Sequence, residues 1–598
     1  MAPEPSAPER RAALSMLATY LRPEGRRLAA LVVLTFGTVG LDLYVPQLLR
    51  RFIDGAQGQL PLADLSRVAV TFLLLALLKK TAEAAGAYVG QDLRWRATNR
   101  MRADLTRHTL RLGMDFHHGQ TPGKMIERVD GDVTALSNLM SDTFLKVASN
   151  VLVTGGVLIL LAREDWRLGA AFAVFVLVAG LGLRRAASIA VPAWTRVREA
   201  SAELFGFLEE KLAGTEDIRA LGARDWVLAR FLDRSADYRR LHRRAGMLGS
   251  AVWVGTIALF TMGNALAFGM SAWLFTAGGI TVGTVYLIFH YTEKLREPIE
   301  QLSHQLEEIQ RAGGAMKRVV ELFQLPVRQR PEGGLPLPSG ALGLQIHDLC
   351  FSYVPERPAL AGLSVHLRPG EVLGLLGRTG SGKTTLSRLL FRLYDIDGGS
   401  MKLGGVELRE AHLQGLRQRI GLVTQDVQVL GASVRENLRF FDPTISDERI
   451  HAALSDLGLA DWLAALPQGL DTELEAGAGG LSAGEAQLLA FARVFLRDPG
   501  LVILDEASAR LDPATEQRIE RAVDQLLAGR TGIVIAHRLG TVSRCDQILI
   551  LEDGRQLEAG ERLSLLADSN SRFSRLMALG HEHSSGGLSA DPLLEVLA

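Results

Sequence analysis

Long apolar runs dominate the first half of the chain. Between Ala245 and Thr292 the sequence contains no Asp, Glu, Lys or Arg. About 20 apolar residues are enough for a helix to cross a bilayer. This run therefore predicts two membrane-spanning helices, separated by the glycine-containing turn at residues 278–283.

Four more apolar runs precede this one, at residues 28–49, from Val68 onward, at 144–162 and at 168–183. A short polar stretch separates the last two runs. Together the runs predict six spanning helices, and residues 293–323 are expected to continue the last helix beyond the membrane.

Charged residues interrupt the first two runs. They are Asp42 in the first run and Lys79, Lys80 and Glu83 in the second. Ionisable side chains at membrane depth are costly in lipid and face a bundle interior or a water-filled cavity. The sequence leaves two interpretations open: the charges pair with one another, or they contact a polar or anionic cargo.

Two long connections carry most of the basic residues of this half. Residues 91–129 contain eight Lys and Arg, and residues 184–244 contain thirteen. The positive-inside rule places both connections in the cytoplasm. Turn residues at 119–123 and 214–217 are candidates for docking on another domain. Six spans also bring both termini to the cytoplasm. Residues 1–27 predict no signal peptide but a short interfacial helix.

Composition narrows the functional class. The 598 residues contain 66 Lys plus Arg and 66 Asp plus Glu, so the net charge is zero and we expect no nucleic-acid partner. Two cysteines exclude a disulfide framework and a four-cysteine zinc site. Only nine of the basic residues are lysines, so each lysine is a candidate for a specific role.

The second half contains a phosphate-binding motif. Residues 377–384 read Gly-Arg-Thr-Gly-Ser-Gly-Lys-Thr, between a strand-like run at 371–376 and a helical pattern at 385–391. The glycines let backbone N–H groups face phosphates, Lys383 reaches the β and γ oxygens, and Thr384 offers a hydroxyl to Mg²⁺. This motif predicts nucleotide binding.

Further candidates follow apolar strand-like runs. Asp505 and Glu506 come directly after residues 501–504, and they fit a Mg²⁺ ligand and a group that polarises the attacking water. His537 follows the run at 532–536, and Gln425 follows 420–423. The last two signals are weak individually and gain weight from their order along the chain.

In this order, with the segment Leu-Ser-Ala-Gly-Glu at 481–485, the motifs resemble the ATP-binding cassette (ABC) domain. With six predicted spans ahead of it, the chain resembles an ABC half-transporter of the exporter type over about residues 10–580. The resemblance implies an all-α six-helix transmembrane domain followed by an α/β P-loop ATPase domain. It also implies that Tyr353 stacks on adenine, and that Ser482 and Gly484 close over ATP held by a second subunit.

The resemblance and the motifs together define the expected sites. The residues expected to hold ATP are Tyr353, Gly377, Arg378, Thr379, Gly380, Ser381, Gly382, Lys383, Thr384, Thr385, Ser482 and Gly484. The expected Mg²⁺ ligands are Thr384, Gln425 and Asp505, and the expected catalytic residues are Glu506, His537 and Gln425.

The expected domain organisation follows the same division. It consists of a cytoplasmic N-terminus with an interfacial helix at 1–27, a transmembrane domain at 28–323, a Pro- and Gly-rich linker at 324–340, an ATP-binding cassette domain at 341–580 and a tail at 581–598.

One motif departs from the family pattern. The segment at 481–485 reads LSAGE where the family usually has LSGGQ, so Ala483 adds a methyl group and Glu485 adds a negative charge near a triphosphate. Glu506 is intact. Two interpretations stay open: a heterodimer in which this chain supplies the catalytic glutamate and a weaker signature face, or a homodimer in which LSAGE is adequate.

We therefore expect an ATP-hydrolysing exporter or flippase that moves an unidentified substrate by alternating access. We expect it to be a multi-pass protein of the cell membrane, in contact with lipid, with a cytoplasmic ATPase domain. The alternatives are an ATP-gated regulatory or channel-like ABC membrane protein and, less favoured, a soluble ABC-type ATPase acting on nucleic acid.

Overall fold

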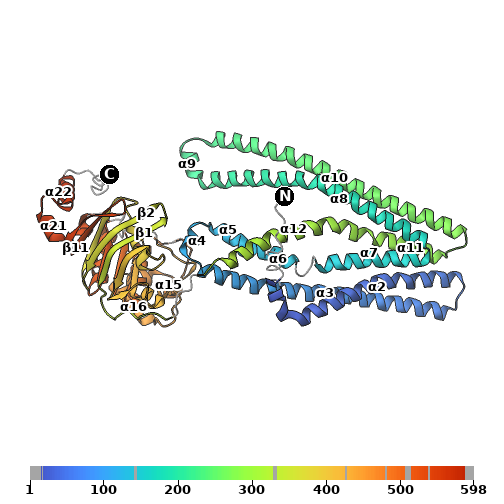
Figure 1. The fold of residues 1–598 in the computed structure, drawn as a ribbon, viewed down its shortest axis with the longest axis horizontal. Coiled ribbons are helices and arrows are strands. Elements are labelled where there is room, and N and C mark those ends of the chain that lie inside the picture. The colour runs from blue at the N-terminus through green and yellow to red at the C-terminus, as the bar shows by residue number, and fades with distance from the viewer. Residues whose placement is uncertain are drawn as a thin grey trace. The chain divides into compact units, whose positions relative to one another are not determined.

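The structure is a computed structural model, and it describes residues 15–16, 18–139, 144–327, 333–424, 427–477, 481–505, 513–536 and 539–585. Internal contacts divide the chain into two units. The first comprises residues 1–111 and 120–326, and the second comprises 112–119 and 327–598. The first unit is helical and the second is mixed α/β, which confirms the predicted fold class (Figure 1).

Long helices build the first unit. They are α2 (Gly25–Gln57), α3 (Leu62–Arg111), α7 (Phe144–Glu164), α8 (Trp166–Ala213), α10 (Arg224–Thr276), α11 (Val282–Lys294) and α12 (Arg296–Gln324). Shorter elements are η1 (Arg22–Glu24), α5 (Pro122–Ile126), the π-helical turn η2 (Glu127–Asp132), α6 (Val133–Asn138) and α9 (Thr215–Ala220). The 48 residues of α8 rise about 72 Å, far more than the roughly 30 Å of a bilayer core, so this helix continues well beyond a membrane.

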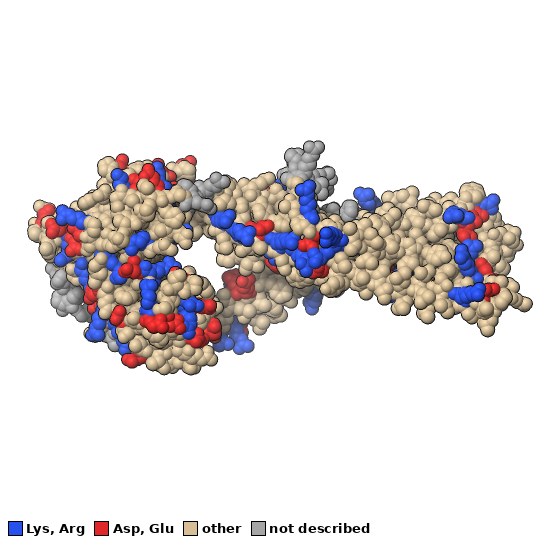
Figure 2. All heavy atoms as spheres, turned by 90° about the horizontal axis from the view of Figure 1, so that it is seen from below, with Lys and Arg blue, Asp and Glu red and all other residues tan. Residues whose placement is uncertain are grey.

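Four helical stretches among the described residues are long and apolar enough to cross a membrane. They are Ala18–Gln57, Leu145–Glu164, Trp166–Ala213 and Arg224–Thr276. The predicted second and sixth spans fall on α3 and α11, so the number of six spans stays a prediction. On the face shown in Figure 2, the helical unit carries a broad belt with few charged atoms, bounded by charged residues on both sides.

The predicted sixth span and its predicted continuation at 293–323 form two helices, α11 and α12, and not one continuous helix. Residue 298 is a proline, which has no N–H to donate to the carbonyl of Lys294, four residues earlier. The regular helix therefore ends at Lys294 and restarts at Arg296.

The charges in the predicted spans contact one another. Asp42 Oδ1 accepts hydrogen bonds from Lys79 Nζ at 2.5 Å and from Lys294 Nζ at 2.8 Å. Lys80 Nζ donates to Glu83 Oε2 at 2.8 Å. The structure thus favours the pairing interpretation, and it adds Lys294 of α11 as a partner that we did not predict.

The described residues of the second unit form three sheets. The antiparallel sheet has the order β2-β1-β4-β5, with β1 (Leu344–Val354), β2 (Arg357–Leu367), β4 (Gly398–Leu403) and β5 (Val406–Glu407). The six-stranded sheet has the order β12-β11-β3-β10-β9-β6, with β3 (Val372–Gly377), β6 (Ile420–Val423), β9 (Leu501–Asp505), β10 (Thr531–Ile535), β11 (Gln547–Glu552) and β12 (Arg555–Glu561). Strands β7 (Ala432–Ser433) and β8 (Glu473–Leu474) form a small pair.

Helices surround these sheets. They are α4 (Met114–His118), α13 (Lys383–Leu390), α14 (Leu413–Arg419), α15 (Val434–Arg439), α16 (Asp447–Asp456), α17 (Ala460–Ala465), α18 (Ala483–Arg497), α19 (Pro513–Leu527), α20 (Leu539–Val542), α21 (Arg562–Ala567) and α22 (Arg572–Ser585), with the 3₁₀ turn η4 (Gly469–Asp471).

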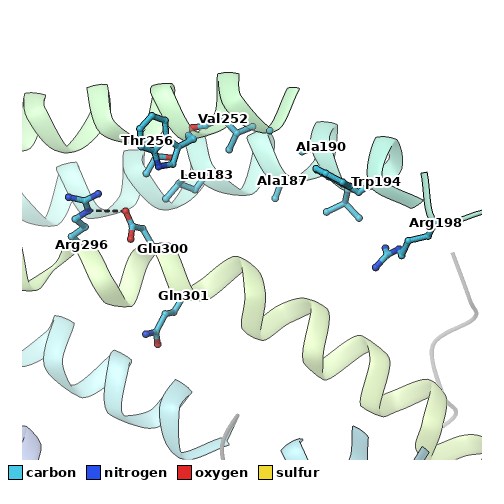
Figure 3. A pocket seen from close by; sticks show the side chains of 13 residues that line it. Leu183, Ala187, Ala190, Trp194, Arg198, Val252, Thr256, Arg296, Glu300 and Gln301 are labelled. Atoms are coloured by element: carbon cyan, nitrogen blue, oxygen red, sulfur yellow. Dashed lines mark hydrogen bonds and ion pairs between the residues drawn. The ribbon is translucent and has the colours of Figure 1, made fainter. Parts of the chain in front are cut away.

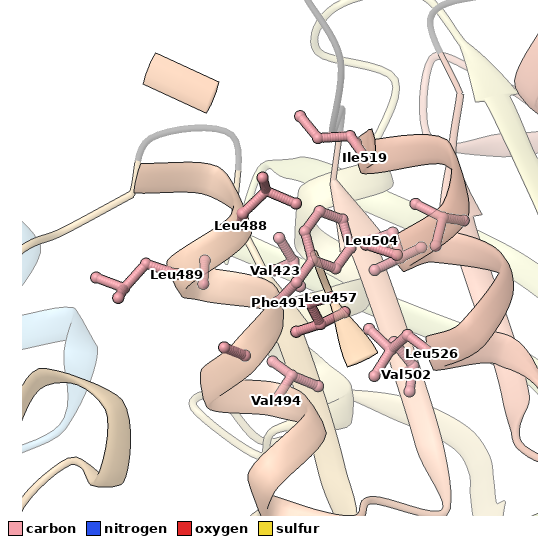
Figure 4. Close-up of a cluster of buried hydrophobic side chains, with 14 of the residues drawn as sticks. Val423, Leu457, Leu488, Leu489, Phe491, Val494, Val502, Leu504, Ile519 and Leu526 are labelled. Atoms are coloured by element: carbon pink, nitrogen blue, oxygen red, sulfur yellow. The ribbon is translucent and has the colours of Figure 1, made fainter. Parts of the chain in front are cut away.

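Buried apolar strands form the core of the second unit. Strands β3, β6, β9, β10 and β11 run parallel, and β3 and β10 are buried along their whole length, as expected when helices cover both faces of a parallel sheet. Side chains of α18 and α19 pack against β6 and β9, with Phe491 near the centre (Figure 4). The four apolar runs predicted as strands before the candidate site residues are confirmed as β3, β6, β9 and β10.

Helix α4 belongs to the second unit although it lies between helices of the first along the chain. Met114 packs against the core of the antiparallel sheet, and Tyr394 Oη lies 3.3 Å from His118 Nδ1. The segment that belongs to the second unit, residues 112–119, thus lies just before the predicted turn at 119–123. At the other predicted turn, 214–217, Gly214 alone lies between helices, because α8 ends at Ala213 and α9 already begins at Thr215.

Candidate functional site

The phosphate loop connects β3 to α13, as the sequence predicts. Its glycines have positive φ angles of 150° at Gly377, 87° at Gly380 and 106° at Gly382, a region that side chains disfavour. A Cβ at Gly377 would lie 2.3 Å from the Leu551 carbonyl oxygen. The glycines therefore allow the strand, the loop and the neighbouring β11 to approach one another closely.

Lys383 and Ser381 point into this loop. Lys383 is 6% exposed, and its Nζ donates to the backbone oxygens of Gly377 at 2.5 Å and Arg378 at 2.8 Å. The Ser381 hydroxyl is buried and has no hydrogen-bond partner within the part of the chain that the structure describes. A buried hydroxyl without a partner costs free energy, and an added phosphate oxygen would satisfy it.

Neighbouring strands end at the same edge of the sheet. Strand β10 lies between β3 and β9, and Ile535 pairs with Leu375 on one side and Asp505 on the other. Carboxyl ends of parallel strands in an open α/β sheet are where ligands bind. The phosphate loop and Asp505 are thus both at this edge, with Thr384 in the first turn of α13.

Tyr353 lies beside the phosphate-loop helix. Its side chain is 41% exposed, its hydroxyl lies 3.3 Å from Thr385 Oγ1, and Arg388 donates to it at 3.2 Å. The ring of Tyr394 meets Tyr353 edge-on, with the centroids 5.1 Å apart. An exposed aromatic ring fixed next to a phosphate loop is suited to stack on a nucleotide base.

Known proteins share both units. Residues 28–298 match the family described as "ABC transporter transmembrane region", and residues 360–509 match the family described as "ABC transporter". The Bacillus subtilis protein YknV, an uncharacterized ABC transporter ATP-binding protein, is 30% identical over 478 residues, which cover 78% of each chain. The chain belongs to the ABC transporter family.

Two further likenesses extend over almost the whole ABC transporter chain. The ATP-dependent lipid A-core flippase of Photorhabdus laumondii is 27% identical over 92% of this chain and 94% of that protein. The structure of a bacterial Atm1-family ABC exporter with ATP bound has a TM-score of 0.76 and 23% identity, and it covers 95% of this chain and 99% of that one. The latter likeness shows the fold.

Family membership confirms the predicted biochemical class. The chain is an ATP-driven membrane transporter whose nucleotide-binding domain hydrolyses ATP. It combines one membrane unit with one ATPase unit, which is the composition of a half-transporter that works with a second half. The residues that hold the nucleotide are tested by none of these likenesses and stay predictions.

In this ABC transporter the signature segment at 481–485, which differs from the usual family sequence, forms a capping box. Ser482 caps α18, and its Oγ accepts from the Glu485 backbone N at 3.3 Å. The Glu485 carboxylate accepts from the Ser482 backbone N at 2.7 Å. Gly484 is buried in the first turn, whereas Ser482 and Ala483 are exposed. Within the described residues, no hydrogen bond or ion pair joins Ser482 to the phosphate loop.

Three predicted site residues cannot be placed. Gln425, Glu506 and His537 lie outside the described residues. Strands β6, β9 and β10, which precede them along the chain, end at the edge that carries the phosphate loop.

Sequence reasoning missed two features of the site. The capping box was readable, because Ser482 and Glu485 have the S-x-x-E spacing of this motif. The position of Tyr394 between Tyr353 and His118 had no signal in the sequence, because it depends on packing between residues 276 positions apart.

The donor set fits Mg²⁺ that is shared with a nucleotide. Mg²⁺ is usually held by one or two carboxylates together with substrate phosphates. The described residues contain no cluster of three or more His, Cys, Asp or Glu that could hold a metal alone. One carboxylate from Asp505 and one hydroxyl from Thr384 match the smaller set.

Proposed function

We propose that this chain is one half of an exporter or flippase, and that ATP binding and hydrolysis at the edge of its six-stranded sheet drive alternating access of the membrane unit. The observation that carries the proposal is the glycine loop with Lys383 at the same sheet edge as Asp505, in a chain that also has the ABC membrane unit. The name of the Photorhabdus relative, an ATP-dependent lipid A-core flippase, supports the flippase form of this proposal.

The residues of the loop act first in this mechanism. Lys383 exchanges the backbone oxygens of Gly377 and Arg378 for the β and γ oxygens of ATP, and Ser381 donates its buried hydroxyl. Tyr353 stacks on the adenine. Thr384, Asp505 and Gln425 would hold Mg²⁺, which would neutralise charge on the phosphates.

The strand-end residues carry the chemistry. Glu506 accepts a proton from the attacking water, and His537 contacts the γ-phosphate. Release of phosphate removes the charge that holds two ATPase domains together, so each turnover reopens them. Helix α4, which contacts Tyr394, is one element that can transmit this change toward the membrane helices.

We propose that the partner is a second, different ABC half. The Glu485 carboxylate sits at the N-terminus of α18 and uses the Ser482 N–H, one of the donors that a triphosphate from the partner would meet. Negative charge at this position opposes ATP. The partner therefore provides the stronger signature face for the catalytic Glu506 of this chain, and a homodimer remains the outcome to test.

We further propose a multi-pass protein of the cell membrane with six spans, a cytoplasmic ATPase domain and the domain boundaries given above. The belt with few charged residues and the basic connections at 91–129 and 184–244 support this topology.

The test is ATP turnover by the tagged chain, purified with whatever protein accompanies it. We expect turnover to fall at least about 100-fold in Glu506→Gln and to persist in Glu448→Gln, a matched change at an exposed position of α16. Equal turnover in both variants would refute the proposal. A second ABC half that copurifies supports the heterodimer, whereas full cooperative turnover by the chain alone contradicts it.

A further inference from the structure

A cavity of about 710 Å³ lies in the membrane unit between α8, α10 and α12 (Figure 3). Pockets for drug-sized ligands occupy about 300–1,000 Å³. The Asp42 charge network does not line this cavity. The cavity is therefore a site of its own, with the size needed for a small organic molecule.

Small residues create the space. Ala187 and Ala190 of α8 and Gly249 of α10 line the cavity, together with the apolar side chains of Val191 and Val252. A Cβ at Gly249 would have only Trp194 Nε1 nearby, at 3.7 Å. The middle of the cavity is therefore an apolar slot between two helices.

The cavity lining contains more positive than negative side chains. Arg296 Nε and Glu300 Oε1 pair at 2.9 Å, so these two residues neutralise each other (Figure 3). Arg198, at the other end of the lining in Figure 3, makes one hydrogen bond, to Thr195 Oγ1 at 3.4 Å, and has no carboxylate partner in the described part of the chain. The lining therefore carries one uncompensated positive charge. A guanidinium binds carboxylate, sulfate and phosphate groups well.

The cavity lies where apolar sequence gives way to charged sequence on all three helices. On α8 the apolar run ends at Leu183, the first lining residue, and Arg198 is about 22 Å further along the helix. On α10 the lining begins at Gly249, just inside the uncharged run, and on α12 it begins at Arg296, just beyond it. The lining thus changes from apolar to polar as a lipid headgroup region does.

The aromatic side chains of the lining are typical of a position between apolar and polar surroundings. Trp194 and Trp253 line the cavity and are 38% and 65% exposed. Tryptophan is enriched where an apolar and a polar environment meet, because its ring is apolar and its N–H is polar. A ligand that satisfies the whole lining must itself have an apolar body and a polar end.

We propose that this cavity is the cargo site, and that the cargo is an amphiphilic organic anion with an apolar chain or ring system and one sulfate, phosphate or carboxylate group. Arg198 binds the anionic group beside Trp194, and the apolar body lies along Ala187, Ala190 and Val252. The inference rests on the proposed function, because a cargo site has meaning only in a transporter. The cargo enters from the leaflet that faces the basic connections.

Binding of decyl sulfate tests the chemistry without using ATP. The wild-type complex in nanodiscs of zwitterionic lipid is titrated with radiolabelled decyl sulfate, or with decyltrimethylammonium, which has the same chain and the opposite charge. We expect saturable binding of decyl sulfate at least about tenfold tighter than of the cation. Arg198→Gln should weaken it about tenfold, whereas Arg198→Lys should retain it within about threefold.

Matched variants separate the cavity from general effects on the membrane surface. Arg196→Gln removes an exposed arginine of the same helix that does not line the cavity, and it should leave binding unchanged. Ala190→Phe should fill the slot and abolish binding. Equal binding of the two amphiphiles, or equal effects of Arg198→Gln and Arg196→Gln, would overturn the proposal.

ATP turnover then distinguishes cargo from a structural lipid. Decyl sulfate should stimulate turnover in the wild type and in Arg196→Gln, and Arg198→Gln should lose the stimulation. Binding without any effect on turnover would overturn the cargo assignment. Failure of the proposed function has a different signature, namely basal turnover that is equal in the wild type and in Glu506→Gln.

Discussion

Replacing Glu485 with Gln should strengthen ATP binding across the dimer interface and slightly destabilise the ATPase unit. The carboxylate is partly exposed and lies at the N-terminus of α18, where it accepts from Ser482 N at 2.7 Å. Gln at this position can still form a capping box. The substitution therefore removes a charge and keeps the local structure.

The two effects have opposite signs and different sizes. Two unit charges 4 Å apart interact by about 1 kcal/mol in water and about 4 kcal/mol at an effective dielectric constant of 20. A partly exposed carboxylate beside the partner's γ-phosphate lies between these limits, at about 2 kcal/mol, which corresponds to about 30-fold in ATP affinity. Loss of the favourable interaction with the helix N-terminus costs about 0.5 kcal/mol of folding stability.

The assay is the half-saturating ATP concentration for turnover of the purified complex, with thermal unfolding measured on the same sample. Glu448→Gln is the control, because Glu448 also lies in the first turn of a serine-capped helix, α16. We expect the half-saturating concentration to fall at least about tenfold in Glu485→Gln and to stay constant in the control. Equal values in both variants would refute the argument that Glu485 opposes the triphosphate.

Three further changes have defined outcomes. Asp42→Asn removes the carboxylate that Lys79 and Lys294 share, and Lys79 keeps only the longer contact with Glu83, at 3.5 Å. The change should cost about 2 kcal/mol, visible as a lower Tm in detergent, whereas Lys80→Gln at the exposed side of the cluster should cost much less. Gly377→Ala places a Cβ 2.3 Å from the Leu551 oxygen and should cost about 2–4 kcal/mol, with loss of nucleotide binding measured by fluorescence of a labelled ATP. Burial raises the pKa of Cys545 to about 12, so its thiol stays protonated at pH 8. Mass spectrometry after brief alkylation should therefore find Cys350 modified, and Cys545 should stay unmodified until the protein unfolds.

The parts of the fold that could be predicted are those whose signal is local. Residues 371–391 contain the strand, the glycine loop and the helix in one continuous stretch, so the phosphate loop was readable in full. The apolar runs before Asp505 and His537 predicted β9 and β10 for the same reason. Local patterns also contained the capping box at Ser482, although its consequence for Glu485 required the observed hydrogen bonds.

The features that escaped prediction depend on contacts between distant residues. Lys294 and Asp42 are 252 positions apart, and only packing of α11 against α2 brings them together. The grouping of α4 with the ATPase unit depends on Met114 and Tyr394, which no periodicity connects. The cavity between α8, α10 and α12 likewise arises from small residues that face one another across helices.

The most direct test of the central claim is ATP-dependent accumulation of labelled decyl sulfate in sealed vesicles that contain the complex with its ATPase units outside. The account predicts uphill accumulation with ATP in the wild type, and none in Glu506→Gln or without ATP. Equilibration that needs no hydrolysis, or equal accumulation in Glu506→Gln, would identify a passive, ATP-gated pathway and contradict it.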